Sequence, residues 1–198
     1  MPRPSNTEHR RGQIVSALRQ VMASGGYDGA STAAIAAAAG LAPGLLHYHF
    51  GSKEEILIAL AEELGVALRA RYEKRAARAK SDWERLVALL DAHVALGPDA
   101  DRDSVVCWVM LGTEALRKPD VRNVVERLYR ERLAELTRLV EPLLSGSRRS
   151  EASGIAAALL SAIEGAYQLD VLGRIAPRGF AAPMLRTLAR ALLAEGES

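Results

Sequence analysis

The stretch STAAIAAAAGLAPGLLHYHFGSK, residues 31–53, predicts two short helices joined by a tight turn. Ser31 and Thr32 can cap the first helix, because a hydroxyl there accepts a hydrogen bond from an otherwise unpaired backbone N–H. Gly40 suits the left-handed backbone that ends a helix. Pro43 suits the first turn of the next helix, where its missing N–H costs nothing.

One face of the second short helix is expected to stay exposed. Leu46 and Phe50 would bury that helix against the first one. The positions left on the exposed face are Pro43, Gly44, Leu45, His47, Tyr48 and His49. A helix-turn-helix protein places such a face in the major groove of DNA. We therefore expect double-stranded DNA as the partner of this helix.

The same stretch resembles the DNA-binding domain of TetR-type transcriptional repressors. The resemblance rests on Gly40-Leu-Ala-Pro-Gly, on His47-Tyr48-His49-Phe50 and on Lys53, and it extends over about residues 10–60. It implies a homodimer that binds a palindromic operator and is released by a small-molecule effector. The sequence itself leaves open whether the protein represses or activates transcription.

The resemblance also implies a role for individual residues. Phosphate contacts are expected from Thr32, His47, His49 and Lys53, and base contacts from Ala33, Pro43, Gly44, Leu45 and Tyr48. His47 stands where the family has a tyrosine. The base-contacting set lacks Arg, Asn and Gln, so we expect recognition through thymine methyl groups, the Tyr48 hydroxyl and DNA shape. Arg3, Arg10 and Arg11 can add phosphate or minor-groove contacts from an N-terminal arm, which we expect to be disordered when free.

Composition limits the class of protein. The net charge of the 198-residue chain is only +2, so DNA contacts must come from a local basic patch. The single cysteine excludes an intramolecular disulfide framework. No apolar run approaches the roughly 20 residues that span a bilayer, and MPRPSNTEHRR lacks the apolar core of a signal peptide. A cytoplasmic protein without a membrane contact is expected.

The periodicity of apolar residues predicts an all-α fold. The expected helices cover about 7–24, 31–39, 43–49, 53–79, 81–96, 102–117, 119–144, 151–173 and 180–194, with a loop at 145–150. We assign residues 1–52 to a helix-turn-helix DNA-binding domain and residues 53–198 to a helical ligand-sensing and dimerisation domain. The helix at 102–117 is apolar all round and is expected inside the second domain.

An effector site in the second domain is expected among polar or aromatic groups within apolar helices. The candidates are His93, Cys107, Trp108, Met110, Thr113, Glu114, Tyr129, Glu164, Tyr167 and Asp170. The alternative is that Trp108, Met110 and Tyr129 are core residues. The segments CWVMLGTEALRKPDVRNVVERLYRERL and AIEGAYQLDVL resemble the choline-responsive BetI subgroup of TetR-type repressors. That resemblance implies a cationic ligand held by Trp108 and a carboxylate.

The last two helices are the expected dimer interface. Small residues on the first of them permit close approach, and apolar area is expected from Leu159, Ile163, Leu185, Leu188 and Leu192. Two copies would then form a four-helix bundle with two-fold symmetry.

Two other classes of function differ from this reading in what they require of the sequence. A helical protein-interaction module without specific DNA binding would use the helix-turn-helix only for packing. An enzyme is not expected, because the sequence has no nucleophile-base pair and no Gly-rich phosphate loop. Neither a metal nor a cofactor is expected, since His47 and His49 are two residues apart and point to different sides of a helix.

Overall fold

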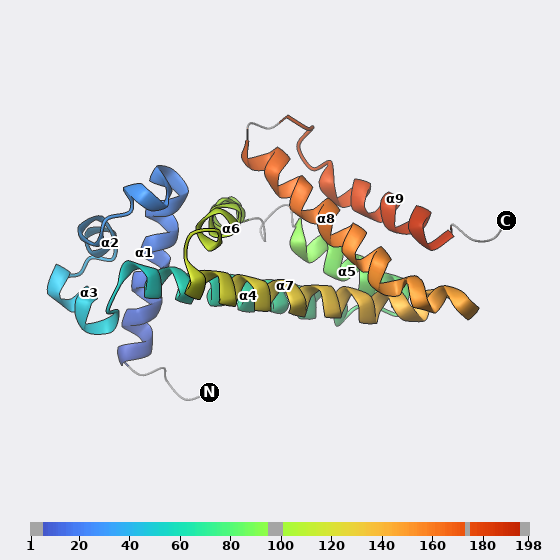
Figure 1. Cartoon of the computed structure of the whole chain (residues 1–198), viewed down its shortest axis with the longest axis horizontal. Helices are drawn as coiled ribbons and strands as arrows, with labels where there is room; N and C mark the ends of the chain where they lie inside the picture. The colour runs from blue at the N-terminus through green and yellow to red at the C-terminus, as the bar shows by residue number, and fades with distance from the viewer. Residues whose placement is uncertain (1–5, 95–100, 173–174, 195–198) are drawn as a thin grey trace. The chain divides into compact units, whose positions relative to one another are not determined.

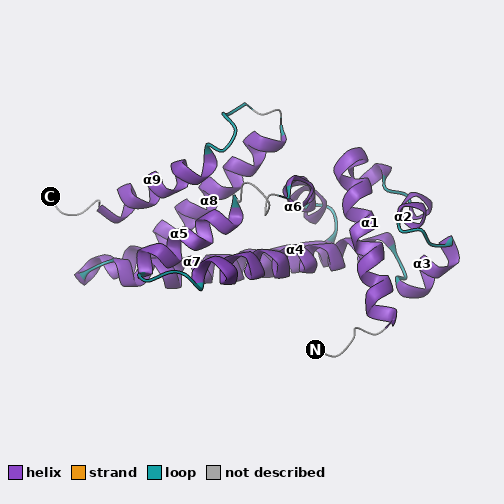
Figure 2. Ribbon diagram, turned by 180° about the vertical axis from the view of Figure 1, so that it is seen from behind, coloured by secondary structure: helices purple, strands orange, loops and turns teal. Residues whose placement is uncertain are grey.

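The computed structural model describes residues 6–94, 101–172 and 175–194, and every regular element within these ranges is a helix (Figures 1 and 2). The predicted all-α class is therefore confirmed. The described residues divide into two compact units. The first unit combines the residues up to Gly65 with Arg102–Glu126, and the second combines those from Val66 to Asp101 with the residues from Arg127 onward.

The first unit begins with three helices that pack together (Figure 1). They are α1 (Asn6–Gly29), α2 (Thr32–Ala38) and α3 (Pro43–His49). The helix predicted at 7–24 continues past its expected end, although its helical backbone is broken at Gly26, where φ is 74°. The turn between α2 and α3 uses Gly40 with φ of 65°, as its position in the sequence predicts.

The long helix α4 (Lys53–Ala76) follows and belongs to the first unit up to Gly65. It begins with a reciprocal cap at Ser52. The Ser52 hydroxyl accepts from the backbone N–H of Glu55 at 3.1 Å, and the Glu55 carboxylate accepts from the N–H of Gly51 at 2.9 Å.

The helix α6 (Arg102–Ala115) packs against α1 in the first unit. Val106, Cys107, Trp108 and Leu111 are buried, as expected from the apolar run. Its packing partner, however, is the helix that begins the N-terminal domain. The sequence showed that α6 had to be covered, and it did not show by which element.

The second unit contains α5 (Asp82–His93), the later part of α7 (Pro119–Val140), and the helices α8 (Ala152–Val171) and α9 (Ala181–Ala194). The helices α8 and α9 pack side by side, and α5 packs against α9 (Figure 1). Two short 3-10 segments, Glu141–Leu143 and Gly146–Glu151, connect α7 to α8. The loop predicted at 145–150 is thus largely a 3-10 helix.

Three of the apolar residues expected at the dimer interface are buried within the chain itself. Leu159, Ile163 and Leu185 each have no exposed surface, so they form the core of the second unit and supply no contact area to a partner. Leu188 and Leu192 remain half-buried. The prediction was wrong for Leu159 and Ile163 because α8 carries apolar or small residues on most of its circumference, which leaves its inward face undefined by sequence. It was wrong for Leu185 because α9 packs against α8 and α5 of the same chain.

Candidate functional site

The helix α3 is held by its buried residues and presents a solvent-exposed face. Leu46 and Phe50 are each 1% exposed, as their spacing predicted. Tyr48 is 79% exposed and Leu45 is 37% exposed, so Tyr48 does not cover the helix pair. Pro43, Gly44 and His47 are also exposed, whereas His49 is half-buried. The structure therefore places most of the predicted base-contacting residues on one accessible helix.

The start of α2 carries two further residues that the sequence predicts to contact DNA, Thr32 and Ala33. Ser31 is the N-cap, and its hydroxyl accepts from the N–H of Ala34 at 3.1 Å. Thr32 is the first helical residue and is half-buried, while Ala33 is exposed. The capping role belongs to Ser31, so the Thr32 hydroxyl is not needed for the cap.

Arg11 attaches α1 to the end of α3. Its Nη1 donates to the backbone carbonyl of His49, and its guanidinium lies 3.9 Å from the centre of the Phe50 ring. Arg10 donates to the side chain of Gln13 at 2.9 Å. Both arginines lie within α1 and not on an arm, because the helix begins at Asn6. Arg3 and the expected disordered arm lie outside the described residues.

Lys53 is engaged within the first unit. Its Nζ donates to the backbone carbonyl of Tyr27 at 2.9 Å and lies 4.0 Å from the centre of the Tyr27 ring. Lys118 approaches the same ring at 5.0 Å and pairs with Glu114 at 2.6 Å. The predicted phosphate contact of Lys53 would compete with these interactions.

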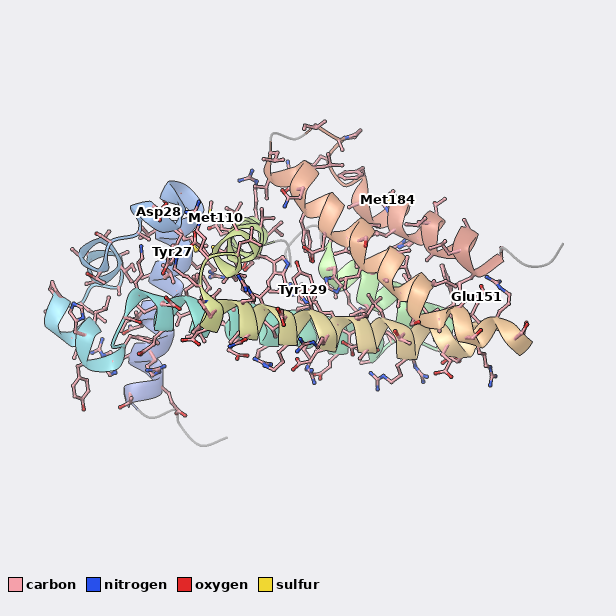
Figure 3. The ribbon with its side chains drawn as sticks, viewed as in Figure 1. Tyr27, Asp28, Met110, Tyr129, Glu151 and Met184 are labelled. Carbon is pink, nitrogen blue, oxygen red and sulfur yellow. The ribbon has the colours of Figure 1, made fainter. Side chains whose placement is uncertain are left out.

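Burial, followed by the negative charge of Glu114, raises the pKa of Tyr27 to about 12. Figure 3 labels Tyr27 and Met110 in the region where α1 packs against α6. Sequence reasoning missed Tyr27, because the lysines that meet at its ring are 26 and 91 positions away.

The candidate effector residues fall into two groups. Five of them lie on α6 in the first unit, namely Cys107, Trp108, Met110, Thr113 and Glu114. Cys107 is fully buried and its thiol contacts the backbone carbonyl of Arg19 at 3.5 Å. Trp108 is 4% exposed, which agrees with the core alternative. Thr113 is exposed.

The second group lies in the second unit and includes a buried hydrogen-bonded pair. His93, at the end of α5, is 3% exposed, and Tyr167, on α8, is 7% exposed. The Tyr167 hydroxyl donates to the backbone carbonyl of His93 at 3.0 Å and lies 3.0 Å from Nδ1 of the same residue. Asp170 is exposed at the end of α8.

Two arginines and one carboxylate accompany this pair. Arg132 Nη1 lies 3.7 Å from Glu164 Oε1, and the Arg132 guanidinium lies 5.9 Å from the centre of the Tyr129 ring. Arg71, on the later part of α4, donates from Nε to the carbonyl of Ala92 at 3.1 Å. Figure 3 labels Tyr129 on α7. We call His93, Tyr167, Tyr129, Arg132, Arg71 and Glu164 the polar cluster.

Burial and positive charge keep His93 neutral. Desolvation lowers the pKa of His93 well below 6.5, and Arg132 and Arg71 lower it further. Burial also lowers the pKa of Arg132. Burial raises the pKa of Tyr167, so that its hydroxyl keeps its proton.

Sequence reasoning missed the two arginines of the polar cluster, although a signal was present. Arg132 falls four residues after Leu128 and four before Leu136, which is the inward stripe of α7. Arg71 follows the buried Leu68 by three residues on α4. Burying a charged side chain costs free energy unless it has a partner. An arginine at an inward position of a helix is therefore unusual and can be recognised from the sequence.

The described ranges hold neither a cluster of metal ligands nor a membrane-spanning helix. No group of three or more His, Cys, Asp or Glu there is placed to hold a metal ion. Among the helices of the same ranges, none is long and apolar enough to cross a membrane.

Comparison with known families matches both parts of the chain. Residues 14–60 match the bacterial regulatory proteins of the tetR family, and residues 83–195 match the C-terminal part of BetI-type transcriptional repressors. The HTH-type transcriptional regulator BetI of Brucella anthropi is 29% identical over 187 residues, which is 92% of each chain. That of Rhizobium meliloti is 30% identical over 84% of this chain and 80% of its own.

Solved structures share the fold. A transcriptional regulator from Rhodococcus sp. Rha1 superposes with a TM-score of 0.82 at 20% identity, over 92% of this chain and 95% of its own. A regulator from Saccharomonospora viridis, solved in complex with choline, superposes with a TM-score of 0.78 at 21% identity, over 96% and 97%. The helix-turn-helix geometry and both family matches lead to one conclusion: the chain belongs to the TetR family of bacterial transcriptional regulators and carries a BetI-type C-terminal region.

Proposed function

We propose that the protein is a homodimeric repressor that binds a palindromic DNA operator through α3 and leaves it when a small molecule binds. The observation that carries the proposal is the face of α3, where Tyr48 is 79% exposed while Leu46 and Phe50 anchor the helix. A short helix that is anchored by two buried side chains and presents the rest of its face to solvent has the arrangement of a recognition helix that enters the major groove. The match of residues 83–195 to BetI-type transcriptional repressors supports repression as the mode of regulation.

The proposed DNA contacts follow from this geometry. Tyr48, with Pro43, Gly44, Leu45 and Ala33, reads base edges and DNA shape. Thr32, His47 and His49 contact phosphates, and Lys53 does so with the part of its ammonium not used by Tyr27. Phosphate contacts make the affinity fall steeply with salt.

The experiment is selection of bound sequences from a random duplex library, followed by affinity measurement on the selected site. Tyr48→Ala is expected to weaken binding at least about tenfold, or about 1.4 kcal/mol, and Thr32→Ala to weaken it on every sequence. Leu116→Ala is the matched control, since Leu116 is 74% exposed in the turn that follows α6. If no palindrome is enriched at low salt, or if Tyr48→Ala binds as the wild type does, the protein-interaction alternative is favoured.

We further propose that α8 and α9 form the dimer interface. The outward face of α8 is lined by small residues with two leucines at its end, namely Gly154, Ala157, Ala158, Ser161, Gly165, Leu169 and Leu172. These side chains let a second helix approach closely, and Leu172 is 70% exposed. Half-buried Leu188 and Leu192 on α9 add apolar area.

Sedimentation equilibrium tests this interface. Ala158→Arg is expected to shift the protein toward monomer, because a charged side chain cannot be buried there without a partner. Ala70→Arg on the exposed side of α4 serves as the control. A dimer that persists with Ala158→Arg would place the interface elsewhere.

The division of the chain into a DNA-binding domain at 1–52 and a sensing domain at 53–198 remains our proposal. The polar cluster in the second unit supports a sensing role there, since it gathers half-buried charged side chains around the buried His93 and Tyr167, and charged residues are seldom drawn inside a protein without a specific use.

A further inference from the structure

The interior of the second unit holds a hydrogen-bond acceptor without a donor. Nε2 of His93 is buried and has no hydrogen-bond partner. A buried polar atom left in this way lowers the stability of the folded state, because it has lost its hydrogen bond to water and gained none in return. Such atoms in folded proteins call for an explanation.

The hydrogen bonds of Tyr167 fix which ring nitrogen of His93 carries the proton. The Tyr167 hydroxyl has one hydrogen and donates it to the carbonyl of His93. Its contact with Nδ1 at 3.0 Å is then a hydrogen bond only if Nδ1–H donates to the Tyr167 oxygen. The ring is neutral because it is buried beside two arginines. Nε2 therefore carries a lone pair, and it accepts from an O–H or N–H group.

The charges around this acceptor determine which ligand it favours. Arg71 and Arg132 act on both His93 and Tyr167, and Glu164 is the carboxylate that acts on Tyr167. Two positive charges against one negative charge leave an excess of one positive charge. A cation approaching the buried ring of His93 is repelled, whereas an anion is attracted.

We propose that the polar cluster binds a small hydroxylated acid, whose hydroxyl donates to Nε2 of His93 and whose carboxylate balances Arg71 and Arg132. This inference rests on the proposed ligand-responsive function and assigns it a chemical class. It also separates this chain from its fold neighbour that was solved with choline. A quaternary ammonium would meet the two arginines, while buried Trp108 lies on α6 in the first unit.

Two pairs of probes test the hydroxyl, and one pair tests the charge. Mandelate and lactate are compared with phenylacetate and propionate, which lack the hydroxyl. Choline is compared with neohexyl alcohol, its uncharged carbon isostere. Binding to the DNA-free full-length protein is measured by isothermal titration calorimetry. At least one hydroxy acid is expected to bind at least about tenfold more tightly than its partner, and choline at least about tenfold more weakly than its isostere.

Two substitutions at one position separate the hydrogen bonds of His93. His93→Asn places an amide near Nδ1, so it keeps the donor to Tyr167 and removes the Nε2 acceptor. His93→Gln places an amide oxygen near Nε2, so it keeps an acceptor there and loses the Nδ1 donor. The preference for the hydroxy acid should disappear in His93→Asn and persist in His93→Gln. Circular dichroism of both variants establishes that they are folded.

The proposal is overturned if neither hydroxy acid binds at millimolar concentration, if each binds no better than its partner acid, or if choline binds as tightly as its isostere. An unchanged preference in His93→Asn also overturns it. Operator affinity is measured separately by fluorescence anisotropy on the selected DNA. If the wild-type protein does not bind this DNA specifically, the proposed function is refuted, whereas the calorimetric result on the hydroxy acids still stands.

Discussion

The neutral state of buried His93 predicts a specific dependence of stability on pH. The unfolded side chain takes up a proton below about pH 6.5, whereas the folded one does not, because burial and two arginines hold its pKa well below that value. Protons then favour the unfolded chain, so this contribution to stability is present at neutral pH and is lost as pH falls. His93→Gln removes the titrating group.

The magnitude follows from the pH interval below the unfolded pKa. Each pH unit corresponds to about 1.4 kcal/mol, so a change from about pH 7.5 to about pH 5 should cost the wild type about 2 kcal/mol through His93. His93→Gln will be less stable at neutral pH, since it loses a hydrogen bond to Tyr167. The free-energy difference between the two proteins should therefore shrink by about 2 kcal/mol over this interval.

Urea denaturation followed by circular dichroism measures both free energies, at one protein concentration because the chain is proposed to dimerise. His9→Gln is the control, since His9 is exposed near the start of α1. The reasoning is refuted if the stability of the wild type and of His93→Gln changes in parallel with pH. It is also refuted if His9→Gln reproduces the effect.

Three further outcomes are expected. Ser31→Ala loses the cap of α2 and should lower the free energy of unfolding by about 1 kcal/mol, as measured by urea denaturation. Thr187→Ala, at an exposed position on α9, should not lower it. Gly40→Ala forces a side chain into φ of 65° and should destabilise by about 1–2 kcal/mol, while Gly44→Ala, with open space around it in α3, should raise the melting temperature. The Tyr27 phenol should titrate at about pH 12 in an ultraviolet titration, and Tyr27→Phe should remove this step.

Local sequence signals predicted the DNA-facing part of the structure most closely. The bounds of α3 agree residue for residue with the prediction, because Pro43 fixes the start and the spacing of Leu46 and Phe50 fixes the buried face. The cap at Ser31 and the turn at Gly40 depend on the chemistry of single residues and were equally readable.

Contacts between distant residues could not be read from the sequence. Lys53 has the appearance of a free surface cation, and only the fold brings it to the carbonyl of Tyr27, 26 residues away. Likewise, the partners of His93 lie on α7, α8 and the end of α4. The buried face of α8 was ambiguous for a different reason. Apolar and small residues surround this helix, and only packing decides that Leu159 points inward.

The packing of α6 against α1 has a consequence for exchanging parts between related regulators. A cut after residue 52 would transfer α1 and leave behind the helix that buries one of its sides. The transplanted part would carry an uncovered apolar surface unless the recipient supplied a matching α6. A functional chimaera should therefore exchange Arg102–Ala115 together with the N-terminal helices, although the two segments are separate in the sequence.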